Sequence, residues 1–279
     1  MRHKRNPRRY AAGFSRRFLE AIGAQAAGAG VIAVFAPDML KNQWWLIAVA
    51  VVVAATWAVF KQRQTSPSQW YAHGNFTIRL VVGDLFQQDA SAMVGMTTTF
   101  DTDPTIIDAS SVQGSFLCTV YASSHTRLDQ ELEESLAATK PVSRIVKAGK
   151  PRAYPLGTTA ILEGRGAIRY YCLAYTEMDA HNRAQGSVRG IVHSLDKLWD
   201  AVDMHSNGAP ICVPLLGQGQ SRIPELTPEA AVRLMAFSFF LRCRRNRVSS
   251  ELRIVIHPKE INKIDQTEFQ AFLRSLATE

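Results

Sequence analysis

Six apolar runs of strand length, spread over residues 76–257, limit the folds open to this chain. They are rich in β-branched and aromatic residues, and most lack the strict apolar and polar alternation of a half-exposed strand. Strands of this kind are covered on both faces, as in a parallel sheet. The runs are FTIRLVV (76–82), SAMVGM (91–96), TTAIL (158–162), RYYCLAY (169–175), PICVPLL (210–216) and LRIVIH (252–257).

Segments with helical spacing of apolar residues separate these runs. One contains Leu195, Leu198, Trp199 and Val202, and another contains Leu234, Phe237 and Leu241. The second begins at a clear start signal, with Thr227 as the N-cap and Pro228 at the first helical position. Strands and helices that alternate in this way predict a three-layer α/β/α domain with a mostly parallel, mixed sheet.

The positive charge of the chain is concentrated at its N-terminus. The net charge is +8, and residues 1–63 hold ten Lys and Arg against two acidic residues, which leaves the remainder neutral. This excess flanks two apolar runs, where positive charge indicates which side of a membrane the flanking segments occupy. We therefore expect no nucleic acid partner.

The two N-terminal apolar runs predict a pair of transmembrane helices at about 18–36 and 44–60. The second run has seventeen residues without a charge, and as a helix it would be about 25 Å long. Trp44, Trp45 and Trp57 suit the membrane interface, and the first run has small residues at helix-packing spacing. Basic flanks place both termini in the cytoplasm, as a multi-pass protein of the inner (plasma) membrane.

Two alternatives to the membrane hairpin remain open at this point. SRRFLEAIGAQAAGAG has some features of a twin-arginine export signal, although Glu20 is out of place there. The two runs could also form a core hairpin of a soluble protein. After the basic hairpin segment 1–63, residues 64–75 are polar and predict a linker before a ligand-binding domain at 76–279.

Two strand ends carry distinctive chemistry. Asp84 follows a buried strand directly, where its carboxylate could accept a hydrogen bond from an exocyclic amine. The run at 210–216 is followed by a glycine-containing loop, whose backbone amides could face an anion. Open α/β sheets bind ligands at such carboxyl ends.

Together, VVGDL (81–85) and VPLLGQG (213–219) resemble the macro domain, an ADP-ribose-binding α/β/α fold, over residues 76–279. The resemblance implies that Asp84, with Leu85 beside it, recognises the adenine amino group. It also implies that a glycine-rich loop wraps the diphosphate. That loop consists of Gly217, Gln218, Gly219, Gln220, Ser221 and Arg222.

The chain departs from the family in the loop after the second strand. Hydrolytic macro domains carry an asparagine-rich loop there, which positions the distal ribose and the attacking water. This chain has Thr97, Thr98, Thr99, Phe100, Asp101 and Thr102 instead. We expect residues 97–101, with Gln113 and Gly114 of SSVQG (110–114), to contact the ligand without hydrolysing it, so that no residue is catalytic and no cofactor is needed.

Two membrane helices joined to such a domain resemble the membrane-anchored macro-domain effector of type II Thoeris antiphage defence. This resemblance implies a functional link to a TIR-domain protein that makes an ADP-ribose-derived messenger, understood to be a conjugate with histidine. It further implies that binding leads to homo-oligomer assembly and membrane disruption.

Two other functional classes remain open beside this effector. A membrane-tethered ADP-ribosyl hydrolase would need a base, for which Asp101, His125 and His181 are candidates. A structural membrane anchor would bind no nucleotide.

Four cysteines far apart, with no histidine at ligand spacing, indicate reduced core thiols and no metal site. The acidic LDQELEESL (128–136) and basic RCRRNR (242–247) predict solvated helix faces, or a contact between protomers.

Overall fold

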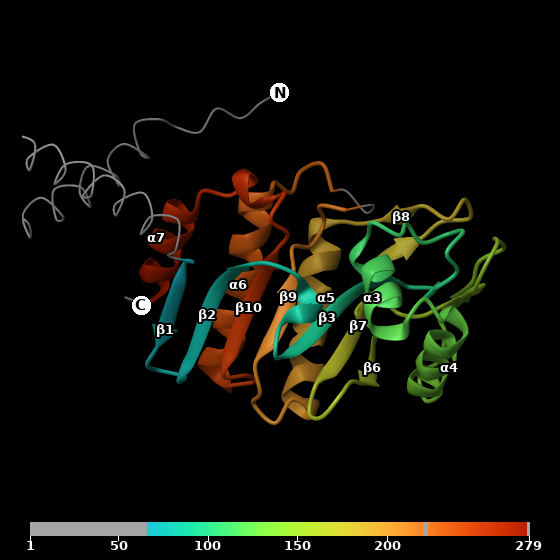
Figure 1. Cartoon of the computed structure of the whole chain (residues 1–279), viewed down its shortest axis with the longest axis horizontal. Helices are drawn as coiled ribbons and strands as arrows, with labels where there is room; N and C mark the ends of the chain where they lie inside the picture. The colour runs from blue at the N-terminus through green and yellow to red at the C-terminus, as the bar shows by residue number, and fades with distance from the viewer. Residues whose placement is uncertain (1–65, 220–222, 278–279) are drawn as a thin grey trace, which may run out of the picture. The chain divides into compact units, whose positions relative to one another are not determined.

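A computed structural model describes residues 66–219 and 223–277 of the chain (Figure 1). The predicted membrane helices at 18–36 and 44–60 lie outside these residues. No helix among the described residues combines the length and apolar character needed to cross a bilayer.

The compact unit that contains the sheet begins at Pro67. Its strands are β1 (Ser68–Tyr71), β2 (Phe76–Val82), β3 (Ser91–Thr97), β4 (Ser143–Arg144), β5 (Arg152–Ala153), β6 (Thr159–Glu163), β7 (Arg169–Met178), β8 (Ala184–Gln185), β9 (Ile211–Pro214) and β10 (Glu251–Ile256). Its helices are η2 (Leu85–Gln87), α3 (Val112–Tyr121), α4 (His125–Leu136), α5 (Val188–His205), α6 (Pro228–Arg245), η3 (Ile261–Lys263) and α7 (Gln266–Ala277). All six predicted strands and both predicted helices are present.

The main sheet is mixed, with strand order β1-β2-β10-β9-β3-β7-β6, and β8 pairs with β7. The five central strands, from β2 to β7, are mutually parallel. β1, β6 and β8 pair antiparallel with their neighbours at the margins. The predicted mostly parallel, mixed sheet is therefore confirmed, and the carboxyl ends of five strands meet at one edge.

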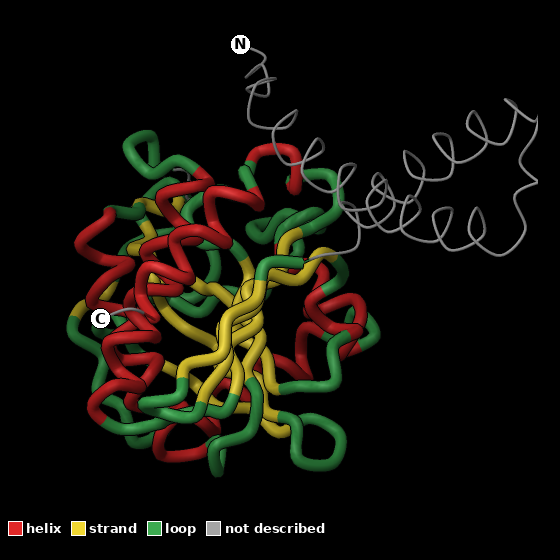
Figure 2. The backbone as a smooth tube through the Cα atoms, turned by 90° about the vertical axis from the view of Figure 1, so that its left-hand side faces the viewer, coloured by secondary structure: helices red, strands yellow, loops and turns green. Residues whose placement is uncertain are grey.

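Helices cover both faces of the sheet, which makes the domain three-layered (Figure 2). Residues of α5, α6 and α7 form one core cluster with one face of the strands, for example Trp199 against Phe239 with ring centroids 5.1 Å apart. Residues of α3 and α4 form a second cluster with the opposite face, where Leu128 and Leu132 are fully buried. The strands thus bury side chains on both faces, as their continuous apolar composition predicts.

The predicted linker at 64–75 needs a correction, because it contains β1. Ser68–Tyr71 pairs antiparallel with β2, and the Tyr71 hydroxyl donates a hydrogen bond of 2.9 Å to the carbonyl of Leu273. A four-residue strand is too short to show a periodicity that could be recognised, and the contact of Tyr71 with α7 joins residues far apart in the sequence. The domain therefore starts at Pro67 and not at residue 76.

The apolar face predicted for α6 is also wrong. Phe237 and Leu241 are 39% and 45% exposed, and Leu234 is only partly buried. The side of α6 that contacts the core contains Val232, Met235 and Phe239. α6 carries two apolar stripes, and spacing alone cannot tell which of them faces the sheet.

Candidate functional site

The carboxyl edge of the five parallel strands gathers most of the predicted site residues. Asp84 follows β2, Gly217 follows β9, and the threonine-rich loop at 97–102 follows β3. The ladder between β9 and β3 contains only the pairs Ser91–Ile211 and Ala92–Cys212, at the beginning of each strand. The carboxyl ends of β9 and β3 are therefore not joined in that ladder, and this is the position where open α/β sheets accept ligands.

Asp84 is held in one orientation by its own chain. It is the N-cap of η2, where Oδ1 accepts a hydrogen bond of 2.8 Å from the backbone N–H of Phe86. Its other carboxylate oxygen has no partner within the described part of the chain. Asp84 is exposed, whereas Leu85 is buried and anchors the turn. The structure thus presents a fixed carboxylate at the edge of the sheet.

The glycine-rich loop begins with a residue that only glycine fits well. Gly217 has φ of +73°, and an added Cβ would lie 3.1 Å from Leu226 and 3.3 Å from Ile191. The Gln218 side chain donates a 2.8 Å hydrogen bond to the carbonyl of Leu226, which ties the loop to the start of α6. An added Cβ on Gly219 would meet nothing within 4 Å. Gln220, Ser221 and Arg222 lie outside the described residues.

Backbone amides of this loop are available to an anion. Among the described residues, the N–H groups of Gln218 and Gly219 have no hydrogen-bond acceptor. Amides that follow a strand and turn together are the usual cradle for phosphate groups. The loop can therefore accept a phosphate without breaking a hydrogen bond of the described structure.

The loop after β3 is buried and internally bonded. Thr97, Thr98, Thr99, Phe100, Asp101 and Thr102 are each at most 8% exposed. The hydroxyls of Thr97 and Thr99 lie 3.2 Å apart, and Thr99 donates to Asp101 Oδ2. Phe100 has φ of +51°, a conformation that costs a non-glycine residue about 1–2 kcal/mol. Strain of this kind persists where surrounding contacts fix the backbone, and it is common at binding sites.

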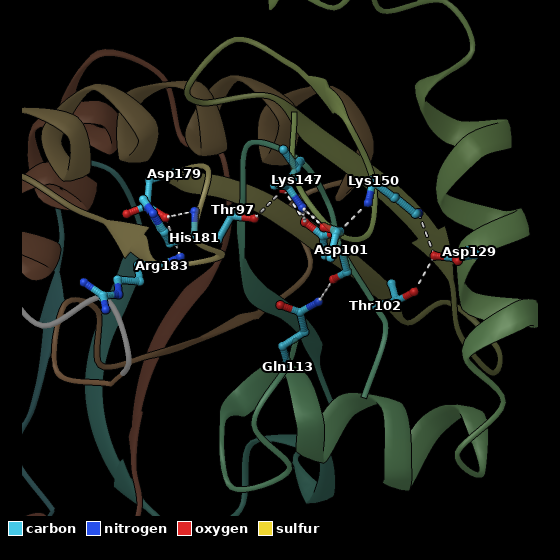
Figure 3. Close-up of polar contacts among 12 residues, drawn as sticks. Thr97, Asp101, Thr102, Gln113, Asp129, Lys147, Lys150, Asp179, His181 and Arg183 are labelled. Carbon is cyan, nitrogen blue, oxygen red and sulfur yellow. Dashed lines mark hydrogen bonds and ion pairs between the residues drawn. The ribbon is translucent and has the colours of Figure 1, made fainter. Parts of the chain in front are cut away.

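Asp101 is the centre of this network (Figure 3). Lys147 Nζ lies 2.8 Å from Asp101 Oδ2, and the two side chains are 0% and 1% exposed. The backbone N–H of Lys150 donates a 2.7 Å hydrogen bond to Oδ1. Both carboxylate oxygens are thus occupied, so Asp101 is not the free acceptor for a ribose, or the free base, that the sequence allowed.

A second layer of contacts joins the same loop to α4. The Thr102 hydroxyl donates to Asp129 Oδ1, and Lys150 Nζ lies 2.6 Å from the same oxygen. Figure 3 shows Lys147 and Lys150 on either side of Asp101, with Asp129 beyond them on the helix. Lys147 and Lys150, which precede β5, therefore hold the loop after β3 in place.

Gln113 and Gly114 have mainly supporting positions. The Gln113 side-chain amide donates to the backbone carbonyl of Asp101. Gly114 accepts the close approach of the preceding turn, since an added Cβ would lie 2.4 Å from the carbonyl of Asp108. Gln113 thus holds α3 against the loop after β3, and Gly114 lets the turn before α3 pack closely on the helix.

The hairpin between β7 and β8 also reaches this edge, although the sequence named only its His181, as a candidate base of the alternative hydrolase. Asp179 Oδ1 accepts hydrogen bonds of 2.8 Å from the backbone N–H groups of His181 and Arg183. The Arg183 hydrogen bond is the largest of the effects that hold the pKa of Asp179 below its usual value. An aspartate followed by turn-forming residues at a strand end was the signal that could have identified it. In Figure 3 this hairpin lies beside Thr97.

No group of three or more His, Cys, Asp or Glu within the described ranges 66–219 and 223–277 is placed to hold a metal ion. His125 and His181, the other candidate bases, are exposed, and His181 lies in the turn closed by Asp179. Within the described part of the chain, the site thus consists of a fixed carboxylate, two backbone N–H groups without an acceptor, and a buried hydroxyl loop.

The strand order and the chemistry of this edge define an α/β/α domain of the macrodomain class. An Oceanobacillus iheyensis macrodomain mutant with ADPR aligns with a TM-score of 0.52 and 12% identity, over 76% of this chain and 100% of that chain. The same macrodomain with ADP aligns with a TM-score of 0.50 and 13% identity, over 77% and 99% of the two chains. At such low identity these matches establish the fold.

Residues 78–257, more than half of the chain, match the family described as Thoeris protein ThsA, Macro domain. The chain belongs to this family. No curated protein matches its sequence.

Proposed function

We propose that this macro domain binds an ADP-ribose derivative along the carboxyl edge of its sheet. Asp84 would accept the adenine amino group, and the loop at Gly217–Arg222 would hold the diphosphate. The loop after β3 would contact the distal ribose and whatever group it carries. Two structures of the same fold, solved with ADPR and with ADP, support this choice of ligand.

The order of these three groups along the sheet carries the proposal. Asp84 follows β2, the glycine loop follows β9 two strands away, and the threonine loop follows β3 next to β9. Neighbouring strands are about 4.8 Å apart, so the three groups span roughly 15 Å in one direction. A base, a diphosphate and a distal ribose occur in the same linear order in ADP-ribose.

Hydrolysis is not part of the proposed function. The one carboxylate of the loop after β3, Asp101, is buried against Lys147 and would have to leave a bonded position to act as a base. Its bonded state suits a structural role. We therefore propose a binding domain that holds its ligand intact.

For the whole chain, we propose a membrane-anchored effector. Residues 1–63 would anchor it in the inner membrane as a helical hairpin with both termini in the cytoplasm, and a TIR-domain protein would supply the ligand, best represented by a histidine conjugate of ADP-ribose. Ligand binding would favour an assembled state that disrupts the membrane. Inverting a 1:99 equilibrium requires about 5.5 kcal/mol of differential affinity.

Calorimetry with ADP-ribose and Asp84 variants tests the ligand site. Asp84→Ala should weaken binding by about 1–3 kcal/mol, because the adenine amine loses its acceptor. Asp84→Asn keeps an oxygen for the N–H of Phe86 and separates the loss of charge from the loss of the η2 cap. Asp196→Ala, which removes an exposed carboxylate from α5, is the matched control and should bind normally. Unchanged affinity in folded Asp84→Ala would contradict the assignment.

Gly219→Val tests the diphosphate loop. Its side chain would enter open space and should block an anion without disturbing the fold. Gly217→Val is less informative, because φ of +73° makes it strained even without ligand. Retention of intact ligand, followed by mass spectrometry after incubation, would support binding; release of ADP-ribose from a modified substrate would instead identify a hydrolase.

A further inference from the structure

The outer face of α6 carries an apolar stripe that the domain itself does not cover. Ala230, Leu234, Phe237 and Leu241 follow one another at intervals of four, three and four residues. Ala230, Phe237 and Leu241 are exposed, and Leu234 is partly buried. Intervals of four and three place all four side chains on one line along the helix, as in the contact seam of a coiled coil.

The charges beside this stripe are already neutralised within the domain. On one side Arg242 pairs with Asp200 and Asp203 of α5, each at 3.1 Å. On the other side Arg233 pairs with Glu268 of α7 at 3.2 Å. α6 thus lies between two helices that are tied to it by ion pairs, and its apolar stripe faces away from both.

The two ends of α6 carry opposite charges. Glu225 and Glu229 lie at its N-terminal end, and Arg244 and Arg245 lie in its last turn. Among the residues that the structure describes, neither Arg244 nor Arg245 has an ion-pair partner, although Arg244 lies over the ring of Phe240. A partner that runs in the opposite direction along α6 would bring acidic residues to the basic end and basic residues to the acidic end.

We infer that this face binds the same face of a second copy of the chain, with the two α6 helices antiparallel. In the register that buries the whole stripe, Leu234 packs on Phe237 of the second copy, and Ala230 packs on Leu241. The same register places Arg244 and Arg245 of each copy beside Glu225 and Glu229 of the other. A two-fold axis between the helices makes both ends equivalent, as a closed dimer requires.

The contact area between the two α6 helices is small, so the dimer should form only at high local concentration. α6 has 18 residues and is about 27 Å long, and one helix pair buries less than the ~1,200 Å² typical of stable complexes. We therefore expect a weak dimer that forms when copies are concentrated, for example when they share a vesicle. The start of α6 adjoins the glycine-rich loop, but the apolar stripe contains none of the proposed ligand-binding residues, so the pairing does not rest on the proposed ligand.

Cysteine cross-linking in the full chain, reconstituted in vesicles, tests the pairing and its direction. All variants carry Cys118→Ser, because Cys118 is exposed and the other three cysteines are buried. A mixture of Ala230→Cys and Leu241→Cys chains with tags of different size should give mixed dimers at least fivefold more than either chain alone. Equal self-linking of Ala230→Cys would indicate parallel or random contact and would overturn the antiparallel pairing.

Two further variants separate this face from other contacts between chains. Phe237→Glu should lower the mixed dimer at least fivefold, whereas Met204→Glu, at a 76% exposed position of α5, should leave it unchanged. A mixture of Glu225→Arg and Arg245→Glu chains should pair better than either variant with itself.

Mixed dimers could be absent while the new thiol of Leu241→Cys is still protected from maleimide in dilute chains. That result would mean that residues 1–65 cover the face. Absence without protection would mean that the face has no occupant in these vesicles. Either outcome would refute the inference, and neither would affect the test of Asp84 by calorimetry.

Discussion

Replacing Lys147 with methionine would leave the Asp101 carboxylate buried without its cation. Removing one partner of a buried pair costs about 3–5 kcal/mol. The carboxylate keeps the Thr99 hydroxyl and the backbone N–H of Lys150 as donors, so we expect the lower end, about 3 kcal/mol. Whole domains have only about 5–15 kcal/mol of stability, so Lys147→Met should fold but be clearly weakened.

Urea unfolding of the isolated domain from Pro67 measures this loss. With a slope near 2 kcal/mol per M, a loss of about 3 kcal/mol lowers the midpoint by roughly 1.5 M. Lys150→Met is the matched control, since it removes a partly exposed pair with Asp129 worth about 0–1 kcal/mol and keeps the backbone hydrogen bond to Asp101. Adding Asp101→Asn to Lys147→Met should cost less than the two single losses combined. Equal, small losses in the two lysine variants would refute the central role of Lys147.

Three more results are expected. Gly149→Ala should destabilise the domain by more than Gly166→Ala in the same urea assay. Both glycines have positive φ, but only at Gly149 would the added Cβ meet an atom of Asp101, at 2.3 Å. Equal losses would contradict the steric contact. Native protein at pH 8 should react with one equivalent of a thiol reagent, at exposed Cys118, and with four after unfolding. At pH of about 10, Cys212 should still not react with the reagent, because burial raises the pKa of its thiol to about 12 and keeps it protonated. Rapid reaction at this pH would argue against a buried thiol.

The sheet could be predicted well from the sequence because its central strands bury both faces. FTIRLVV at 76–82 coincides with β2, and the other five runs differ from their strands by a few residues at the ends. Thr227 and Pro228 fixed the start of α6, and the Thr227 hydroxyl accepts the expected hydrogen bond from Ala230 N–H at 3.2 Å. Local chemistry determines such boundaries, so a single sequence contains them.

Features that depend on distant residues could not be predicted. β1 carries no periodic pattern in its four residues, and the contact that fixes it to α7, from the Tyr71 hydroxyl to the carbonyl of Leu273, comes from the far end of the chain. Asp101 forms an ion pair with Lys147, which is 46 residues away, and the sequence around position 101 does not indicate this partner. Phe237 and Leu241 have correct helical spacing, but the layer of α5, α6 and α7 decides which side of α6 meets the sheet. Each error concerns a partner and not a local structure.

The contacts of Asp101 bear on how the loop after β3 could discriminate between ligands. The hydroxyls of Thr97 and Thr99 and the Asp101 carboxylate are bonded in a chain that ends on Lys147, so internal contacts fix the shape of the loop. A site preorganised in this way gains affinity by avoiding the ordering of mobile groups on binding. The one carboxylate of the loop, Asp101, is paired with Lys147. If the loop after β3 contacts the ligand as proposed, Lys147→Met should therefore weaken ligand binding as well as the fold, and calorimetry with ADP-ribose would measure the first effect.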